Sequence, residues 1–169
     1  SYELGKLIET YPRQIGKSTR RKRIEIAIPI SNVEINGGLL FAFLPTQKNT
    51  GINVHINADF FPEPSRKDIN FNDSSNSDPQ AIWNSTIITL AAKLIASNSE
   101  IILSLLGPTK FWEIVRASRN IFIRANENNA LVPKCYTSFW HEFKKYLPDS
   151  KVIPCGESPI SYRKINECV

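Results

Sequence analysis

The histidines and cysteines of this chain, which could act as nucleophiles, bases or metal ligands, are few and widely spaced, and its carboxylates are scattered. His55 and His141 have no second histidine or cysteine at a metal-ligand spacing, and no serine or cysteine lies in a nucleophile-elbow motif. Cys135, Cys155 and Cys168 are odd in number and form no C-x-x-C pair, which disfavours a disulfide framework and a zinc site. We therefore predict no complete active site, no metal site and a reducing, cytoplasmic location.

Two other patterns fall short of a catalytic motif. Gly16-Lys17-Ser18-Thr19 resembles the end of a phosphate-binding loop, but Tyr11 stands where that motif needs its first glycine, and no apolar strand precedes it. Asp59, Glu63 and Asp68 share one loop region, but their spacing imposes no pairing for acid–base chemistry. Neither pattern predicts a nucleotide pocket or a hydrolase in this chain.

The most unusual stretch is residues 57–69, which places basic side chains in a restrained loop. Two prolines restrict its backbone and two phenylalanines anchor it, and Arg66 and Lys67 follow. An arginine held in this way suits a phosphate or carboxylate contact. From chemistry alone, pairing of Arg66 with Asp68 or Glu63 at the surface is an equal alternative. Lys48, in a loop after the second expected strand, carries no signal of its own.

The net charge of +5 is concentrated at the start of the chain. Residues 1–24 contain seven basic and two acidic residues, and the other 145 residues contain equal numbers of each sign. The run Arg20-Arg21-Lys22-Arg23 could bind nucleic acid or an acidic partner, or it could be a solvated connector. No apolar run reaches the 18–20 residues, roughly, that span a bilayer. We expect no membrane association.

The first half of the chain has the period of strands. Isoleucines alternate through residues 24–30, an apolar run covers residues 39–44, and alternation returns over residues 52–60. Asn36-Gly37-Gly38 supplies turn chemistry between the first two segments, and Pro45 is expected to end the second. Because short turns join the three segments, we predict an antiparallel meander of three strands.

The second half changes to the period of helices. Asp78 can cap a helix with apolar residues from Ile82 to Ile95 at spacings of three and four. Further helices are expected over residues 100–106, 109–117 and 137–147, with a short strand at 120–124. Strands followed by helices predict an α+β fold with helices on one face of the sheet.

The chain is expected to consist of a basic connector (1–22) and one domain (23–169). Within the domain we expect a sheet-rich part (23–72), a flexible loop (73–79), a helix-rich part (80–150) and a closing strand or hairpin (151–169).

Several motifs occur in the order typical of one protein family. They are Gly38 to Pro45, Thr50 to Phe60, Ser65 to Ile69 and the pair Trp83-Asn84. Across residues 24–84 the chain resembles the sacsin and sacsin-like bacterial ATPases, and the likeness is looser beyond that region. The sequence departs from the family at Ala58-Asp59, where sacsin repeats often carry glycine.

The resemblance implies a place directly after an ATP-binding domain of the GHKL type, which gyrase, heat-shock chaperones, histidine kinases and MutL share. It implies a non-catalytic transducer domain with a ribosomal-protein-type fold, in an internal segment of a longer, chaperone-like ATPase that could be a homodimer. ATP and magnesium would belong to the preceding domain, which would be the main partner. By resemblance, Arg66, Lys67 and Lys48 would contact the γ-phosphate. Asn57 would fix a turn and Trp83 would fill the core. The alternative is a protein- or nucleic-acid-binding module that uses Arg20, Arg21, Lys22 and Arg23.

Overall fold

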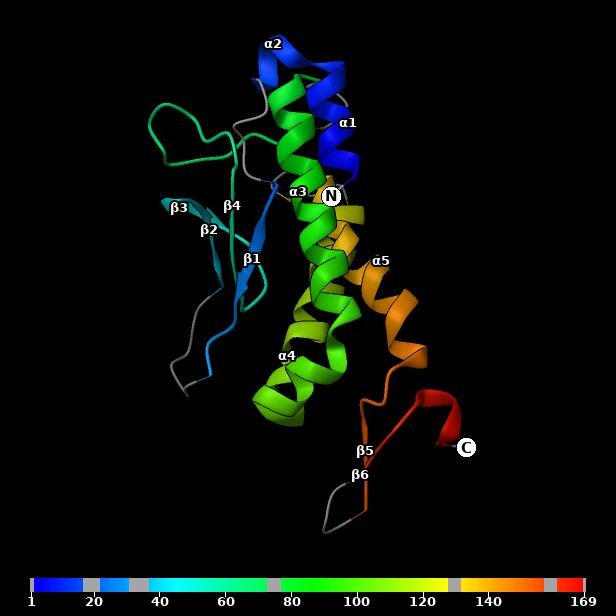
Figure 1. Ribbon diagram of the computed structural model, residues 1–169. Coiled ribbons are helices and arrows are strands. Elements are labelled where there is room, and N and C mark those ends of the chain that lie inside the picture. Colours follow the sequence, from blue (N-terminus) through cyan, green and yellow to red (C-terminus); the bar gives the residue numbers. More distant parts are fainter. Residues whose placement is uncertain are drawn as a thin grey trace.

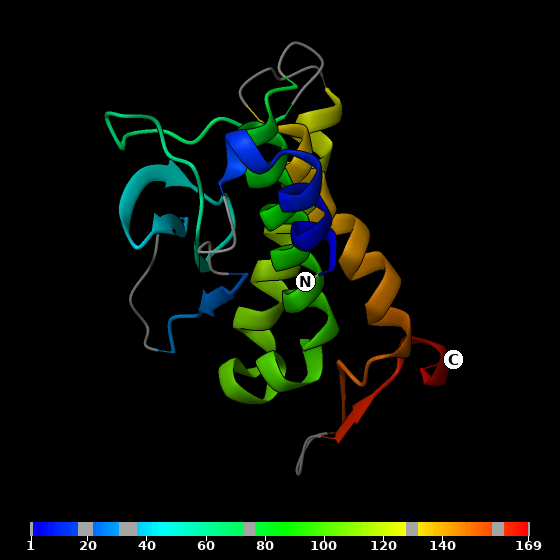
Figure 2. The same cartoon turned by 45° about the horizontal axis from the view of Figure 1, so that its top comes forward.

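The computed structural model describes residues 2–16, 22–30, 37–72, 77–127, 132–156 and 161–168. The predicted α+β class is confirmed, because a four-stranded sheet lies against a group of helices. Figures 1 and 2 show the sheet on one side of the long helix α3 and helix α5 on the other side. The helices therefore cover one face of the sheet, and the other face is directed away from them.

The sheet has four strands in the order β1-β4-β2-β3. Strands β1 and β4 are antiparallel, β2 and β3 are antiparallel, and β2 and β4 are parallel. The predicted meander is therefore wrong, because β4 lies between the first two strands of the chain. The bounds are Ile24–Ala27 for β1, Leu39–Ala42 for β2, Leu44–Asn49 for β3 and His55–Ala58 for β4.

A compact turn before β4 explains this order. The amide of Gly38 donates to the carbonyl of Ile52 at 2.7 Å, and the amide of Thr50 donates to the carbonyl of Gly38 at 2.7 Å. The buried hydroxyl of Thr50 also binds the carbonyl oxygens of Ile52 and Val54. A Cβ at position 38 would collide with the carbonyl of Val54, so only glycine fits here. After β3, the chain therefore passes beside Gly38 at the start of β2. It then enters β4 on the side of β2 opposite to β3.

Strand β3 occupies residues that the sequence predicted to be a loop. It begins directly after Phe43, which forms the turn from β2 with a positive φ of 65°. Pro45 was expected to end the preceding strand, but it pairs with Phe41 within β3. Because β3 is an edge strand, a residue with no amide donor is tolerated there.

Helix α3 (Pro79–Ser97) forms the centre of the molecule, and its predicted cap is confirmed. The Asp78 carboxylate accepts from the amides of Gln80 and Ala81. Helix α4 (Ser99–Asn126) includes a kink at Gly107, where φ is 76°, immediately before Pro108. This kink separates the two helices predicted over residues 100–117.

The short strand predicted at residues 120–124 is wrong, because these residues belong to helix α4. Apolar side chains that are buried along α4 recur at helical spacing and continue through this segment. Beyond the kink they are Phe111, Ile114, Val115 and Ile121. Packing of this face on the core explains why the helix continues where local composition suggested a strand.

The C-terminal part agrees with the sequence-based prediction. Helix α5 (Thr137–Tyr146) buries Phe139 and Phe143, and β5 and β6 form the predicted closing hairpin. The bounds are Ile153–Cys155 for β5 and Ser161–Arg163 for β6, with short 3-10 helices η1 (Lys134–Tyr136), η2 (Leu147–Asp149) and η3 (Ile165–Glu167).

The N-terminal segment, expected to be a connector, contains two helices. Helix α1 (Tyr2–Thr10) and helix α2 (Pro12–Ile15) contact α3, and Leu4 and Ile15 are buried in the core. Apolar residues at a spacing of three and four in α1 provide the reason. The basic residues 17–21 and most of the predicted flexible loop, residues 73–76, lie outside the described residues.

The described helices were compared with the length and composition of a membrane-spanning helix. Within the described ranges, no single helix is long and apolar enough to cross a membrane. Helices α3 and α4 reach that length and composition only as a pair, and the pair is bent by 74°.

Candidate functional site

Residues 61–70 form a short hairpin between β4 and α3, here called the Arg66 hairpin. Pro62 and Ile69 pair as an antiparallel bridge. The amide of Glu63 donates to the carbonyl of Asp68 at 3.0 Å, and the amide of Arg66 donates to the carbonyl of Glu63 at 2.8 Å. The tip of the hairpin therefore consists of residues 64–67, all of which are exposed. The predicted restrained basic loop corresponds to this hairpin.

Arg66 has a backbone conformation that most residues avoid. Its φ is 57°, in the left-handed region that glycine and asparagine adopt more readily. The conformation costs an ordinary L-residue roughly 1–2 kcal/mol. Such strain at an exposed tip motivates a functional hypothesis for the side chain, because a glycine would fit the turn better.

Asn84 clamps both ends of the Arg66 hairpin. Its Oδ1 accepts from the amide of Phe61 at 2.8 Å, and its Nδ2 donates to the carbonyls of Phe61 and Asn70, each at 2.9 Å. The side chain belongs to α3 and is buried. The base of the hairpin is therefore fixed to the central helix by three hydrogen bonds in a region with little access to water.

Trp83 also contacts the base of the Arg66 hairpin. Its ring is fully buried, and Nε1 donates to the carbonyl of Asp59 at 2.8 Å. The ring also meets Phe61 edge to face, with centroids 6.3 Å apart. The expectation that Trp83 fills the core is confirmed. The clamp by Asn84 was not predicted, although a polar residue at helical spacing among buried Ile87, Ile88 and Ala91 is a signal for it.

Lys48 and Asp68 connect the Arg66 hairpin to strand β3. Nζ of Lys48 lies 2.7 Å from Oδ1 of Asp68. The same ammonium lies 5.9 Å from the centroid of the Phe71 ring. The structure thus brings Lys48 to the hairpin that carries Arg66 and Lys67, which the spacing in sequence did not show. The carboxylate of Asp68 pairs with Lys48, whereas the sequence had offered Arg66 as its partner.

Beside this ion pair, strand β3 and Phe71, which follows the hairpin, contact the helical half of the chain. The Phe71 ring meets Tyr136 edge to face at 5.4 Å, and the hydroxyl of Tyr136 donates to the carbonyl of Asn49 at 3.0 Å. Burial raises the pKa of Tyr136 well above its usual value and raises the pKa of Cys135 to about 12. Both groups therefore stay protonated further above neutral pH than an exposed thiol or phenol would.

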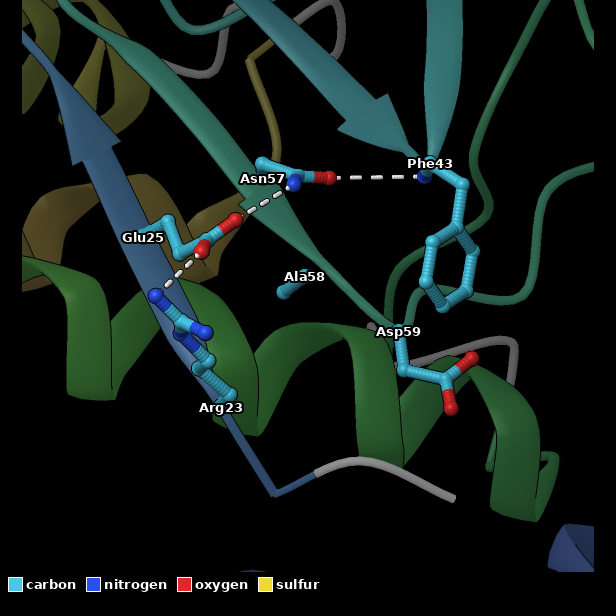
Figure 3. A pocket seen from close by; sticks show the side chains of 6 residues that line it. All are labelled: Arg23, Glu25, Phe43, Asn57, Ala58 and Asp59. Atoms are coloured by element: carbon cyan, nitrogen blue, oxygen red, sulfur yellow. Dashed lines mark hydrogen bonds and ion pairs between the residues drawn. The ribbon is translucent and has the colours of Figure 1, made fainter. Parts of the chain in front are cut away.

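A small pocket lies on the face of the sheet away from the helices (Figure 3). In it, Arg23 pairs with Glu25 at 2.8 Å, Nδ2 of Asn57 donates to Glu25 at 2.7 Å, and Oδ1 of Asn57 accepts from the amide of Phe43 at 3.3 Å. Asn57 thereby holds the turn between β2 and β3, in agreement with the turn-fixing role expected for it. Ala58 and Asp59 complete the lining.

The histidines do not assemble a catalytic or metal site. Nδ1 of His55 accepts from the amide of Leu39 at 3.0 Å, and its ring lies edge-on to Phe41. His141 packs edge-on against Phe122. Over the described ranges, no group of three His, Cys, Asp or Glu residues could hold a metal ion.

The comparisons with known proteins identify no relative. No protein-family model matches the chain, and neither a curated protein nor a solved structure matches it. The resemblance to sacsin-like ATPases therefore remains a prediction from the motifs, and the geometry of the Arg66 hairpin has to carry any functional argument.

Proposed function

We propose that this chain is a non-catalytic transducer domain, in which the Arg66 hairpin presents cations to the γ-phosphate of ATP held by a neighbouring GHKL-type domain of the same polypeptide. Closure of the two domains would bring Arg66 and Lys67 to the phosphate, and hydrolysis would release them. In this way nucleotide turnover is coupled to a conformational change, as in a chaperone-like ATPase.

The observation that carries the proposal is the strained, exposed position of Arg66 on a hairpin with a buried clamp. A guanidinium that stabilises charge in phosphoryl transfer must be held in place before the reaction, because reorganisation would cost part of the stabilisation. Asn84 and Trp83 supply a fixed base for the hairpin. The φ of 57° at Arg66 lowers the stability of the fold, so a requirement for stability does not explain why arginine occupies this position.

The chemistry of the tip also suits a phosphate. Arg66 and Lys67 are adjacent and exposed, and a guanidinium can donate two parallel hydrogen bonds to phosphate oxygens. The adjacent ammonium adds a second positive charge without a fixed geometry. Asp68, the nearest carboxylate in sequence, is already paired with Lys48, so it neutralises the tip less than the sequence suggests.

The alternative is a protein- or nucleic-acid-binding module that uses the basic run at residues 20–23. Arg20 and Arg21 lie outside the described residues, and Arg23 is paired with Glu25 at the margin of the small pocket. An ion pair of this kind reduces the charge available to a phosphate backbone.

The test is ATP turnover of the polypeptide that carries both domains, with Arg66→Ala. We expect kcat to fall by about 100-fold, the usual effect of removing one donor to a developing charge. The KM for ATP should change by less than about twofold, because the neighbouring domain binds the nucleotide. Arg66→Lys should recover only part of the rate, since lysine lacks the two-pronged geometry.

Arg23→Ala is the matched control, because it removes an exposed arginine from a different part of the fold. Its kcat should equal that of the wild type. An Arg66→Ala variant that hydrolyses ATP and closes its domains at the wild-type rate would rule out the proposed role.

A further inference from the structure

We propose that Lys48 and Asp68 form a positioning pair that sets the orientation of the Arg66 hairpin, and that Lys48 acts through Asp68 and not on the phosphate. This inference rests on the proposed function for its kinetic test. It departs from the family resemblance, which would have Lys48 contact the γ-phosphate directly.

Asp68 is held at three points. Its Oδ1 accepts from Nζ of Lys48 at 2.7 Å and from the amide of Ile69 at 2.6 Å. Its carbonyl accepts from the amide of Glu63 on the opposite arm of the hairpin at 3.0 Å. The residue lies two positions from Arg66. A displacement of Asp68 would therefore also displace the tip of the hairpin, which carries Arg66.

Lys48 is equally restrained on its own strand. Its amide donates to Oγ1 of Thr46 at 3.2 Å, and that buried hydroxyl donates to the carbonyl of Leu40 at 2.9 Å. The side chain is only 25% exposed and lies near the face of the Phe71 ring. Lys48 thus presents a fixed charge to the arm of the hairpin, whereas Arg66 and Lys67 face solvent.

The two attachments of the hairpin have different mechanical effects. Asn84 binds Phe61 and Asn70, which are the two ends, so its hydrogen bonds fix the base of the hairpin. The pair Lys48–Asp68 joins one arm to strand β3 beyond that base. A second attachment on a different element restrains the tip further, which is what a guanidinium aimed at a phosphate requires.

The kinetic test is a double-mutant cycle of Lys48→Met and Asp68→Asn in the polypeptide that hydrolyses ATP. Asparagine keeps an acceptor for the amide of Ile69 and removes only the charge. If the residues act as a pair, each variant lowers kcat about fivefold and the double variant is no slower than either. Lys48→Arg, which keeps the charge, should retain the wild-type rate.

If Lys48 instead contacts the phosphate, Asp68→Asn frees it and leaves kcat unchanged or raises it, while Lys48→Met still lowers it. That result, or a double variant about 25-fold slower than wild type, overturns the proposal. Glu25→Gln is the matched control, because it removes the charge from another partly exposed ion pair at 2.8 Å. Its kcat should not change.

A second measurement needs no nucleotide and separates this inference from the proposed function. In the chain itself, hydrogen exchange at the amides of Glu63 and Arg66 reports opening of the hairpin. Asp68→Asn and Lys48→Met should each increase both exchange rates about fivefold, and Glu25→Gln should not. Unchanged exchange overturns the pairing even if Arg66→Ala abolishes turnover, and increased exchange supports it even if Arg66→Ala has no effect.

Discussion

Replacing Arg66 by glycine should stabilise the protein while removing the proposed function. The perturbation is confined to one exposed side chain at the tip of the Arg66 hairpin. The φ of 57° costs an L-residue roughly 1–2 kcal/mol, and glycine adopts it without that cost. Glycine also loses about 0.5–1 kcal/mol more backbone entropy on folding. The expected net gain in the free energy of unfolding is therefore about 0.5–1 kcal/mol.

Thermal unfolding followed by circular dichroism measures this gain. For a chain of this length, a gain of that size corresponds to a rise of about 2 °C in Tm. Arg66→Ala is the control, because alanine keeps the Cβ and therefore the strain, so its Tm should stay within about 1 °C of the wild type. In the ATP-hydrolysing polypeptide, both variants should lose turnover equally.

Two results would refute the reasoning. A glycine variant that melts below the wild type would mean that the arginine side chain makes contacts worth more than the strain. An alanine variant stabilised as much as the glycine variant would mean that removal of the side chain, and not release of the left-handed backbone, causes the gain.

The remaining predictions concern a buried amide and a partly buried thiol. Asn84→Ala should lower the free energy of unfolding in urea by about 2–4 kcal/mol, because three hydrogen bonds are lost and Phe61 is partly buried. Asn126→Ala, which removes a single exposed bond to the carbonyl of Phe122, should cost less than about 0.5 kcal/mol; equal losses would contradict the clamp. Cys135 should react with iodoacetamide at pH 8 at least about 100-fold more slowly in the native protein than in urea, since burial raises its pKa to about 12 and leaves almost no thiolate. Mass spectrometry of the labelled peptides measures the rate, and equal labelling in both states would show that the thiol is accessible.

Local patterns in the sequence predicted the elements that depend on short-range periodicity. The alternation of Ile52, Val54, Ile56 and Ala58 predicted buried side chains, and all four are buried, although β4 covers only His55–Ala58 of the strand expected over residues 52–60. The capped helix from Asp78 and the C-terminal hairpin were also predicted, because hydrophobic spacing and turn chemistry act over a few residues. The restrained loop around Arg66 was predicted for the same reason, since prolines restrict the backbone locally.

The tertiary structure decided what depends on contacts between distant residues. The position of β4 between β1 and β2 follows from the close approach of Gly38 and Val54, which alternation cannot encode. Helices α1 and α2 are held against the rest of the fold because Leu4 and Ile15 are buried in the core. The basic residues that follow them in the sequence had suggested a connector. The attachments of the hairpin to Asn84 and Lys48 join residues 14 to 23 positions apart.

The sequence by itself thus determined which residues form a rigid basic loop, because proline geometry and hydrophobic period are local properties. Only the tertiary structure decided which carboxylate neutralises which cation there. Lys48 and Asp68 are 20 positions apart, and their pairing at 2.7 Å depends on the folding of β3 beside the hairpin. This pairing leaves Arg66, with its strained backbone, and Lys67 as the exposed cations at the tip, because the charge of Asp68 is already balanced by a cation from another strand.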